Sequence, residues 1–243
     1  MSARILHLSD LHVGTHEDNA VERALVTLVE RVRPELLVAS GDLTDRGRRE
    51  QHERAHAFLT GLGVPVLAVP GNHDIRRGLA PFREFERVWQ TTEPEHRAES
   101  FRVVGLNSVR PLRYQGGALS RGQLAAVAGR LGQAPWRVVV LHHHLLGAPW
   151  RAARKRPVSH RNAVLRSLID SGADLILAGH IHQSAVSARR EFAVVGDGER
   201  TAVVAIAPGF GQPRPHRLGE ARGLHVHELG DDGLTIETYT WRG

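Results

Sequence analysis

The chain of 243 residues contains no cysteine. This absence excludes disulfide bonds, thiolate metal sites, iron–sulfur clusters and a cysteine nucleophile. Long apolar runs are missing as well: no stretch of about 18 apolar residues occurs, so we expect no membrane span. The first residues carry a short apolar run without a small-residue cleavage site, which argues against a secretory signal. Together these absences predict a cytoplasmic protein.

Lysine is almost absent, because Lys155 is the only lysine among 32 basic residues. All the others are arginines, and the formal net charge is +6. Arginine-rich surfaces attract anions and pair with phosphate oxygens. Because the arginines are spread along the chain, we do not expect nucleic acid as a partner. Homo-oligomerisation stays open.

Short apolar, β-branched runs that end in polar residues recur along the chain, and this pattern is typical of buried strands. We predict strands at Arg4–Leu8, Leu36–Ser40, Val64–Val69, Phe101–Leu106, Arg137–Leu141, Asp174–Ala178 and Thr201–Ala207. Stretches with helical periodicity predict helices at Ala20–Val32, Arg48–Leu62, Arg83–Trp89, Gly122–Leu131 and Asn162–Ser171. Ser120 is the expected N-cap of the fourth helix. Strand–helix alternation predicts an α/β layered domain.

The last part of the chain follows another pattern. Gly223–Leu229 and Leu234–Trp241 alternate in polarity and flank a Gly/Asp turn, which predicts a β-hairpin over about residues 223–241. No internal repeat or linker is evident, so we expect a single domain over residues 1–243. Irregular segments are expected at Thr91–Ser100, Gly147–Arg161 and Gly209–Arg222.

Five of the predicted strands end in Asp, Asn or His. The segments at these ends are Asp10-Leu11-His12, Gly41-Asp42, Gly71-Asn72-His73-Asp74, His142-His143-His144 and Gly179-His180-Ile181-His182. Ligand sites in open α/β sheets lie outside the carboxyl ends of the strands, so we expect these side chains to converge. Residues i and i+2 of an extended segment face the same side, and Asp10 and His12 can therefore reach one ion together.

Seven of these residues are candidate metal ligands: Asp10, His12, Asp42, Asn72, His142, His180 and His182. Seven donors are too many for one tetrahedral zinc ion and suit two ions with a carboxylate between them. Asp42 is the expected bridge, since it is the lone acid at its strand end. The mixed nitrogen and oxygen set fits Mn, Fe, Zn or Co and disfavours Ca or Mg.

In their order along the chain, the five segments resemble the full signature of the calcineurin-like metallophosphoesterases. The resemblance spans Leu6 to His182. His-Leu-Ser-Asp-Leu-His and Gly-Asp-Leu-Thr-Asp are most similar to the class III cyclic nucleotide phosphodiesterases and their glycerophosphodiesterase relatives. The resemblance implies a four-layer αββα sandwich of two mixed β-sheets flanked by helices.

The resemblance also implies how the ligands are divided. The first metal would be held by Asp10, His12, Asp42 and His182. The second would be held by Asp42, Asn72, His142 and His180, with Asp42 shared. The family usually has His-His-Pro where this chain has three histidines in a row, so His143 remains an alternative to His142 as the ligand.

The implied activity is hydrolysis of cyclic nucleotides or other small phosphodiesters. We expect a metal-bridging hydroxide to attack phosphorus in line, with charge stabilised by the metals and by His73. The resemblance implies that His73 contacts the substrate phosphate, and an imidazole can also protonate the leaving group. Asn72 and Arg76 are further candidate substrate contacts.

Two other functions stay open. A DNA exonuclease of the same superfamily has nearly identical motifs, although such nucleases resemble longer chains with a DNA-binding cap. A catalytically silent scaffold on this fold is expected to lack ligands, and here none of the seven is missing. The substrate itself is not predicted, because specificity depends on loops such as the basic run Trp150–Arg161. Beyond His73, the four ligand histidines and the pair His143–His144, the other nine of the 16 histidines are predicted as ordinary polar positions.

Overall fold

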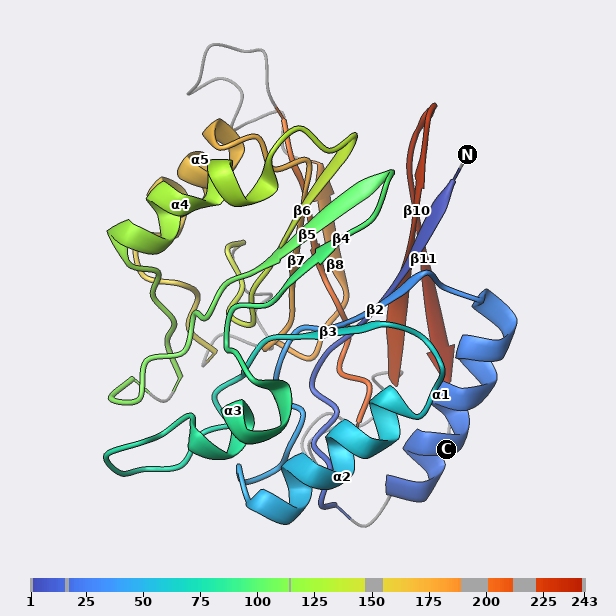
Figure 1. The fold of residues 1–243 in the computed structure, drawn as a ribbon, viewed down its shortest axis with the longest axis vertical. Helices are drawn as coiled ribbons and strands as arrows, with labels where there is room; N and C mark the ends of the chain where they lie inside the picture. Colours follow the sequence, from blue (N-terminus) through green and yellow to red (C-terminus); the bar gives the residue numbers. More distant parts are fainter. Residues whose placement is uncertain are drawn as a thin grey trace.

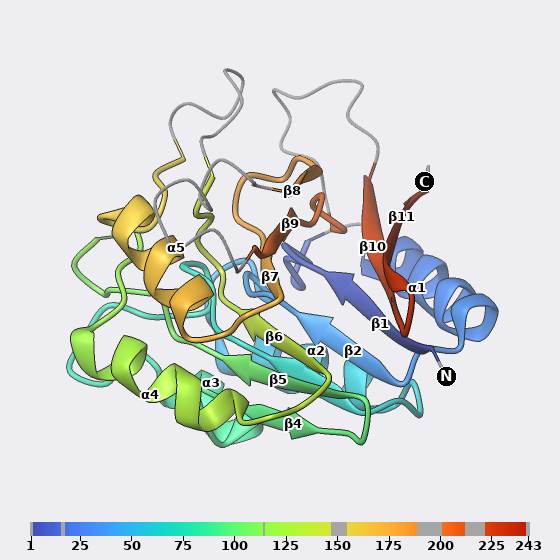
Figure 2. The ribbon, with the colours of Figure 1, turned by 90° about the horizontal axis from the view of Figure 1, so that it is seen from above.

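Two β-sheets pack face to face, with helices on both outer sides (Figures 1 and 2). The computed structural model describes residues 2–15, 18–113, 115–146, 155–188, 201–211 and 222–241. The predicted four-layer αββα sandwich of two mixed sheets is confirmed.

The first sheet has the strand order β11-β10-β1-β2-β3. Its parallel part consists of β1 (Ala3–Leu8), β2 (Leu36–Ala39) and β3 (Val66–Ala68). The predicted C-terminal hairpin is confirmed as β10 (Arg222–Gly230) and β11 (Gly233–Trp241), and β10 pairs antiparallel with β1. The hairpin thereby joins the end of the chain to its beginning and leaves β11 as the edge strand.

The second sheet has the order β4-β5-β6-β7-β9-β8. Its parallel strands are β5 (Phe101–Gly105), β6 (Trp136–Val140), β7 (Leu175–Ala178) and β9 (Val203–Ile206). The two edges, β4 (Glu95–Arg97) and β8 (Ala185–Ala188), run antiparallel to their neighbours.

The edge strands β4 and β8 were not predicted, and β4 lies inside a segment expected to be irregular. Each is very short, and β4 consists of Glu, His and Arg. A short, charged strand such as β4 is typical of a protected sheet edge and carries no apolar alternation, and the four uncharged residues of β8 are too few to show one. Pairing with a neighbouring strand, rather than local sequence, makes these segments strands.

All five predicted helices are present. They are α1 (Asp18–Val32), α2 (Arg49–Thr60), α3 (Arg83–Trp89), α4 (Arg121–Leu131) and α5 (Arg161–Asp170). The predicted cap of α4 is confirmed, because the Ser120 hydroxyl accepts a hydrogen bond from the backbone N–H of Gln123 at 3.1 Å. Such a cap satisfies one of the N–H groups left without a partner in the first helical turn.

Three apolar clusters separate the four layers. The first lies between the helices α1 to α3 and the first sheet, and the third lies between the second sheet and α4 and α5. The middle cluster fills the space between the sheets. In β1, Leu6 and Leu8 belong to the helix-facing cluster, whereas Ala3 and Ile5 belong to the inter-sheet cluster. Both faces of the strand are buried, which explains why its sequence lacks polar alternation.

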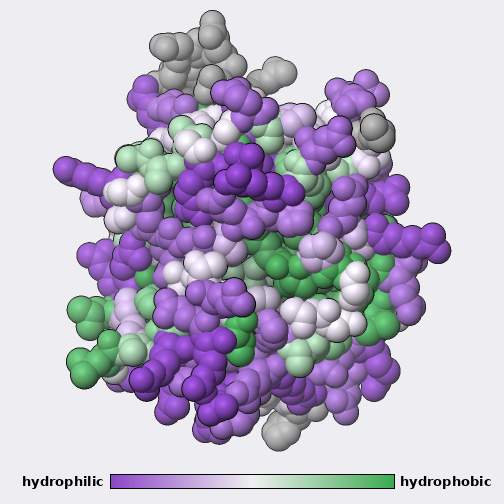
Figure 3. All heavy atoms as spheres, in the orientation of Figure 1, coloured by the Kyte–Doolittle hydropathy of each residue, from purple (hydrophilic) through white to green (hydrophobic). Residues whose placement is uncertain are grey.

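The surface is mostly polar, as the face in Figure 3 shows. Among the described residues, the exposed large apolar side chains are Val26, Leu79, Leu112 and Val186. No described helix combines the length and the hydrophobicity needed to span a bilayer.

Candidate metal centre

The predicted ligands converge beyond the carboxyl ends of β1, β2, β3, β6 and β7. Two groups of carboxylate and imidazole atoms that share Asp42 form there, and a third group, His12, Asp45 and His73, lies at the rim; the atoms within each group lie within 4.8 Å of one another. The first group is Asp10, His12, Asp42 and His182; the second is Asp42, His142 and His180. All of these side chains are buried, and Asp42 belongs to both groups.

The first group is built around Asp10. Its Oδ1 lies 2.9 Å from His182 Nε2 and 3.9 Å from His12 Nε2. His12 Nε2 also lies 3.9 Å from Asp42 Oδ2. The second Asp10 oxygen, Oδ2, accepts the backbone N–H of His180 at 3.0 Å. One carboxylate thus ties the β1 loop to the β7 loop and still directs an oxygen into the group.

The second group is built around His142 Nε2. This atom lies 3.4 Å from Asp42 Oδ1, 3.3 Å from Asn72 Oδ1 and 3.2 Å from His180 Nδ1. Asn72 therefore adjoins the second group. The other ring nitrogen, His142 Nδ1, donates to the carbonyl of Ser40 at 2.8 Å. In the neutral ring this bond leaves the lone pair on Nε2, the atom that faces the group, which is the arrangement of a metal-binding histidine.

His143 belongs to neither group, although its ring packs against those of His142 and His180 with centroids 5.1 and 4.6 Å apart. Its Nδ1 pairs with the hydroxyl of Ser108 at 2.9 Å, and its backbone N–H donates to the same hydroxyl at 3.1 Å. Of the two alternatives left open by the sequence, the structure brings His142 into contact with Asp42 and Asn72.

Five of the predicted ligands have a left-handed backbone. Among the described residues, eight non-glycine residues have positive φ, and five of them, with φ between 51° and 73°, are Asp10, His12, Asp42, His180 and His182. Such conformations cost about 1–3 kcal/mol each and persist at functional sites. The neighbouring turns require glycine, since a Cβ on Gly41 would lie 2.6 Å from His142 Nδ1.

Asp74 fastens two of these turns together. Its carboxylate accepts hydrogen bonds from the backbone N–H groups of Leu43, Thr44 and Gly71 at 2.8–3.1 Å, and from the Thr44 hydroxyl at 2.9 Å. The β2 turn that carries Asp42 is thereby fixed against the β3 turn that carries Asn72.

The two carboxylates are held ionised in the buried cluster. Burial on its own raises the pKa of Asp42, but His142 and His73 outweigh it and hold that pKa well below its usual value. Burial likewise opposes the effect of His182 on Asp10, whose pKa is also well below normal. Burial lowers the pKa of His12 to about 3, whereas Asp42 outweighs burial at His142 and raises its pKa to about 9.

Several buried polar atoms of the cluster have no hydrogen-bond partner among the described residues. They are His12 Nε2, Asp42 Oδ2, Asn72 Nδ2 and His182 Nδ1. Leaving buried polar groups unpaired costs about 1–3 kcal/mol each. Carboxylate oxygens and neutral imidazole nitrogens that face one another are the donor set of a transition-metal site. The residues therefore fit two ions that share Asp42.

His73 lies at the rim of the cluster. Its backbone N–H donates to Asp42 Oδ1 at 2.8 Å, and its ring Nδ1 donates to the carbonyl of Asp45 at 2.8 Å. The ring packs edge-on against that of His12, with centroids 4.8 Å apart. Arg76, the other predicted substrate contact, is exposed, and its backbone N–H donates to Pro81 O at 3.2 Å.

Two predicted features fall wholly or partly outside the described residues. Residues 150–154 of the basic run Trp150–Arg161 lie outside the described part, as do residues 212–221 of the segment Gly209–Arg222. Lys155, which is described, is buried.

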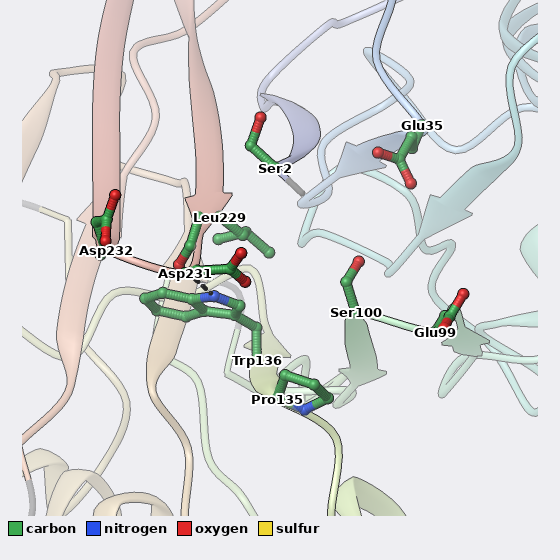
Figure 4. Close-up of a pocket in the computed structure, with 11 residues that line it drawn as sticks. Ser2, Glu35, Glu99, Ser100, Pro135, Trp136, Leu229, Asp231 and Asp232 are labelled. Atoms are coloured by element: carbon green, nitrogen blue, oxygen red, sulfur yellow. Dashed lines mark hydrogen bonds between the residues drawn. The ribbon is translucent and has the colours of Figure 1, made fainter.

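A separate cavity of about 980 Å³ lies near the opposite ends of the strands (Figure 4). Trp136 and Leu229 line it beside the carboxylates of Glu35, Glu99 and Asp231. Its lining comes from the starts of β2, β5 and β6 and from the β10–β11 turn, so it is distinct from the Asp/His cluster.

The fold and the cluster together define a metallophosphoesterase. The model of the calcineurin-like phosphoesterase family matches residues 3–184, and the chain therefore belongs to this family of phosphoester hydrolases. The family that the five ordered motifs resembled is thus confirmed.

Curated relatives carry more specific names. A probable cyclic nucleotide phosphodiesterase from Synechococcus is 27% identical, over 78% of this chain and 77% of the relative. A 3',5'-cyclic adenosine monophosphate phosphodiesterase from Pseudomonas aeruginosa is 29% identical, over 96% of this chain and 87% of the relative.

Solved structures share the fold at low identity. A dimetal phosphatase from Danio rerio superposes with a TM-score of 0.67 at 18% identity, covering 99% of both chains. A purple acid phosphatase from yellow lupin seeds has a TM-score of 0.66 at 12% identity, covering 99% of this chain and 52% of the other.

Proposed function

We propose that this chain is a dinuclear metal-dependent phosphodiesterase that hydrolyses cyclic nucleotides or other small phosphodiesters. The observation that carries the proposal is the position of Asp42, whose two oxygens face two different groups of ligand atoms. The names of the curated relatives from Synechococcus and Pseudomonas aeruginosa support the substrate class.

Asp10, His12, Asp42 and His182 would hold one ion. Asp42, Asn72, His142 and His180 would hold the other. Imidazole together with oxygen donors suits Mn, Fe or Zn. When bound, two such ions supply Lewis acidity toward the phosphoryl oxygens and lower the pKa of a water between them.

The residues around the cluster prepare it for this chemistry. Ser40 fixes the His142 tautomer through its carbonyl, and Asp74 fixes the turns that carry Asp42 and Asn72. His73 is held beside His12 by its bond to Asp45, at a position from which an imidazole can contact a substrate phosphate and donate a proton to the leaving oxygen. Arg76 supplies an exposed cation within three residues of His73.

A hydrolysis panel on metal-reconstituted protein tests the proposal. The substrates are an aryl phosphodiester, an aryl phosphomonoester, cyclic AMP, single-stranded DNA and a nucleotide–sugar pyrophosphate. We expect turnover of the diester and of cyclic AMP without DNA cleavage. DNA cleavage without cyclic nucleotide turnover would replace the proposal with an exonuclease.

Variants make the panel specific to the cluster. His142→Asn removes the ligand around which the second group is built and should abolish turnover of every substrate. His96→Gln is the matched control, because it also replaces a histidine with an amide. His96 lies on the edge strand β4 and belongs to neither ligand group. Equal activity of His142→Asn and the wild type contradicts the proposed centre.

A further inference from the structure

A second histidine cluster lies outside the Asp/His centre. It consists of His7 on β1 and of His225 and His227 on β10, all with an exposed fraction of 0%. One ring nitrogen of each residue lies within 4.8 Å of those of the other two. The sequence predicted ordinary polar positions for these histidines, and that prediction is wrong because all three are in the core.

The strand register places the three rings together. His7 is the direct cross-strand partner of His225, and His227 follows two residues later on the same face of β10. Ile5 and Leu229, which are two residues away on the same faces of these strands, belong to the apolar inter-sheet cluster. Three imidazoles therefore replace apolar side chains at one end of the layer between the sheets, where unpaired polar groups are costly.

Hydrogen bonds occupy the outer nitrogens of two rings. His7 Nε2 pairs with the hydroxyl of Ser40 at 2.9 Å, and His225 Nε2 pairs with the hydroxyl of Ser184 at 2.8 Å. If these nitrogens carry the protons, Nδ1 keeps the lone pair in both rings. A metal-binding histidine has this arrangement, with one nitrogen on the ion and the other donating to a neighbouring acceptor.

The nitrogens that face the other rings lack adequate partners. Nδ1 of His225 has no hydrogen-bond partner among the described residues, and neither does Nδ1 of His227, whose Nε2 faces His7. The remaining contact joins His227 Nε2 to His7 Nδ1 at 3.4 Å, which is long for a hydrogen bond. A tetrahedral ion with bonds of about 2.05 Å holds its nitrogens about 3.3 Å apart. The observed separation matches that spacing.

The ring arrangement supports the same interpretation. Ring centroids in the cluster are 5.6 to 6.2 Å apart, so the rings surround a common point rather than stack. Burial lowers the pKa of His225 to about 4 and that of His227 to about 3, and it also holds the pKa of His7 well below its usual value. All three rings are therefore neutral at pH 7, as metal ligands must be.

We propose that His7, His225 and His227 form a third, structural metal site for a borderline divalent ion such as Zn²⁺. Three imidazoles without a carboxylate suit Zn, Ni or Cu and disfavour Ca and Mg. The ion joins the first strand of the chain to the C-terminal hairpin. It also lies next to Ser40, whose carbonyl orients His142 in the dinuclear centre.

Metal analysis of the full-length protein after dialysis against Zn²⁺ tests the site without reference to activity. The double variant Asp42→Asn/His142→Asn disables the dinuclear centre and is expected to keep about one ion per chain. Adding His225→Asn and His227→Asn to that variant should remove this ion, whereas adding the control His96→Gln should not. A metal-free Asp42→Asn/His142→Asn protein that remains folded overturns the proposal.

Anomalous diffraction from zinc-soaked crystals of the wild type provides a measurement that does not depend on the variants. The expected result is a zinc peak between β1 and β10 among the three rings. Peaks beside Asp42 with none among His7, His225 and His227 refute the third site and leave the dinuclear centre standing. A peak only among these three histidines keeps the third site and refutes the dinuclear centre instead.

Discussion

The two histidine-rich regions are built by different means. The ligands of the proposed dinuclear centre lie in turns beyond the strand ends, and five of them have a left-handed backbone. His7, His225 and His227 lie inside regular strands, in the continuous β1–β10 register. The centre contains two ionised carboxylates, whereas the three-histidine cluster is neutral and has none within its ligand group.

This difference in construction suits the first region to catalysis and the second to a structural role. Turns can bring donors from five strands to one point and leave the ions open to a substrate, at the cost of strained backbone and buried charge. Paired strands can hold side chains in a fixed register without strain, but they place them in the core, away from any substrate. We therefore expect changes in the first region to affect activity and changes in the second to affect stability.

The largest expected effect is that of Asp42→Asn. Asp42 faces both groups of ligand atoms, so the substitution should remove bound metal and reduce kcat/KM by more than the roughly 10–100-fold that loss of an outer partner costs. Steady-state hydrolysis of an aryl diester together with metal analysis measures both. Retention of two ions and of wild-type activity is incompatible with Asp42 as the shared ligand.

His73→Ala should separate catalysis from metal binding. His73 lies at the rim and contacts His12 edge-on, and we therefore expect unchanged metal content and a loss of about 10²–10⁴-fold in kcat, the usual contribution of a general acid. His73→Gln is the companion variant, since it keeps a polar side chain. A parallel fall in metal content would mean that His73 is a ligand instead.

Much of this arrangement could be predicted from the sequence, because the residues concerned form local patterns. Buried strands are continuous apolar runs, and the ligands follow those runs directly. The charged β4 could not be predicted in this way, since pairing with β5 determines it. Backbone acceptors such as the carbonyl of Ser40 have no sequence signal at all.

The sequence around His225 and His227 contains a pattern that points to their position, but the pattern is ambiguous. His225 and His227 alternate with Leu224 and Val226 in a strand that is buried on both faces. Alternation of His with apolar residues looks like an exposed face until the pairing partner of β10 is known. That partner is β1, more than 200 positions away in the chain, and no local pattern identifies it.

In the metal-free protein His225 and His142, one from each region, should contribute to the pH dependence of stability with opposite sign. The folded-state pKa of His225 is lowered to about 4, below an unfolded value of about 6.5. Below pH 6.5 His225 binds a proton in the unfolded chain but not in the folded chain. The free energy of unfolding therefore falls by about 3 kcal/mol as the pH drops from 6.5 to 4. His142, whose folded-state pKa is raised to about 9, contributes stability below pH 6.5 that is lost as the pH rises through 9.

Urea unfolding in the presence of a chelator, from pH 4.5 to 9.5, measures both slopes. His225→Asn should flatten the acid limb and leave the alkaline limb, and His142→Asn should do the reverse. The comparison between the two regions fails if both variants change the same limb.

The smallest effect is expected for Ser184→Ala. This substitution removes the hydroxyl that pairs with His225 Nε2 and should lower the free energy of unfolding by about 1 kcal/mol. It should also weaken zinc binding at the three-histidine site by about 10–100-fold, because the His225 ring loses the acceptor that orients it. Ser108→Ala is the matched control, since it removes an equivalent bond to His143 beside the other centre. Competition with a fluorescent zinc chelator, in the Asp42→Asn/His142→Asn background, measures the affinity. Equal zinc affinity in the two serine variants would show that the Ser184 hydroxyl does not orient His225 for metal binding.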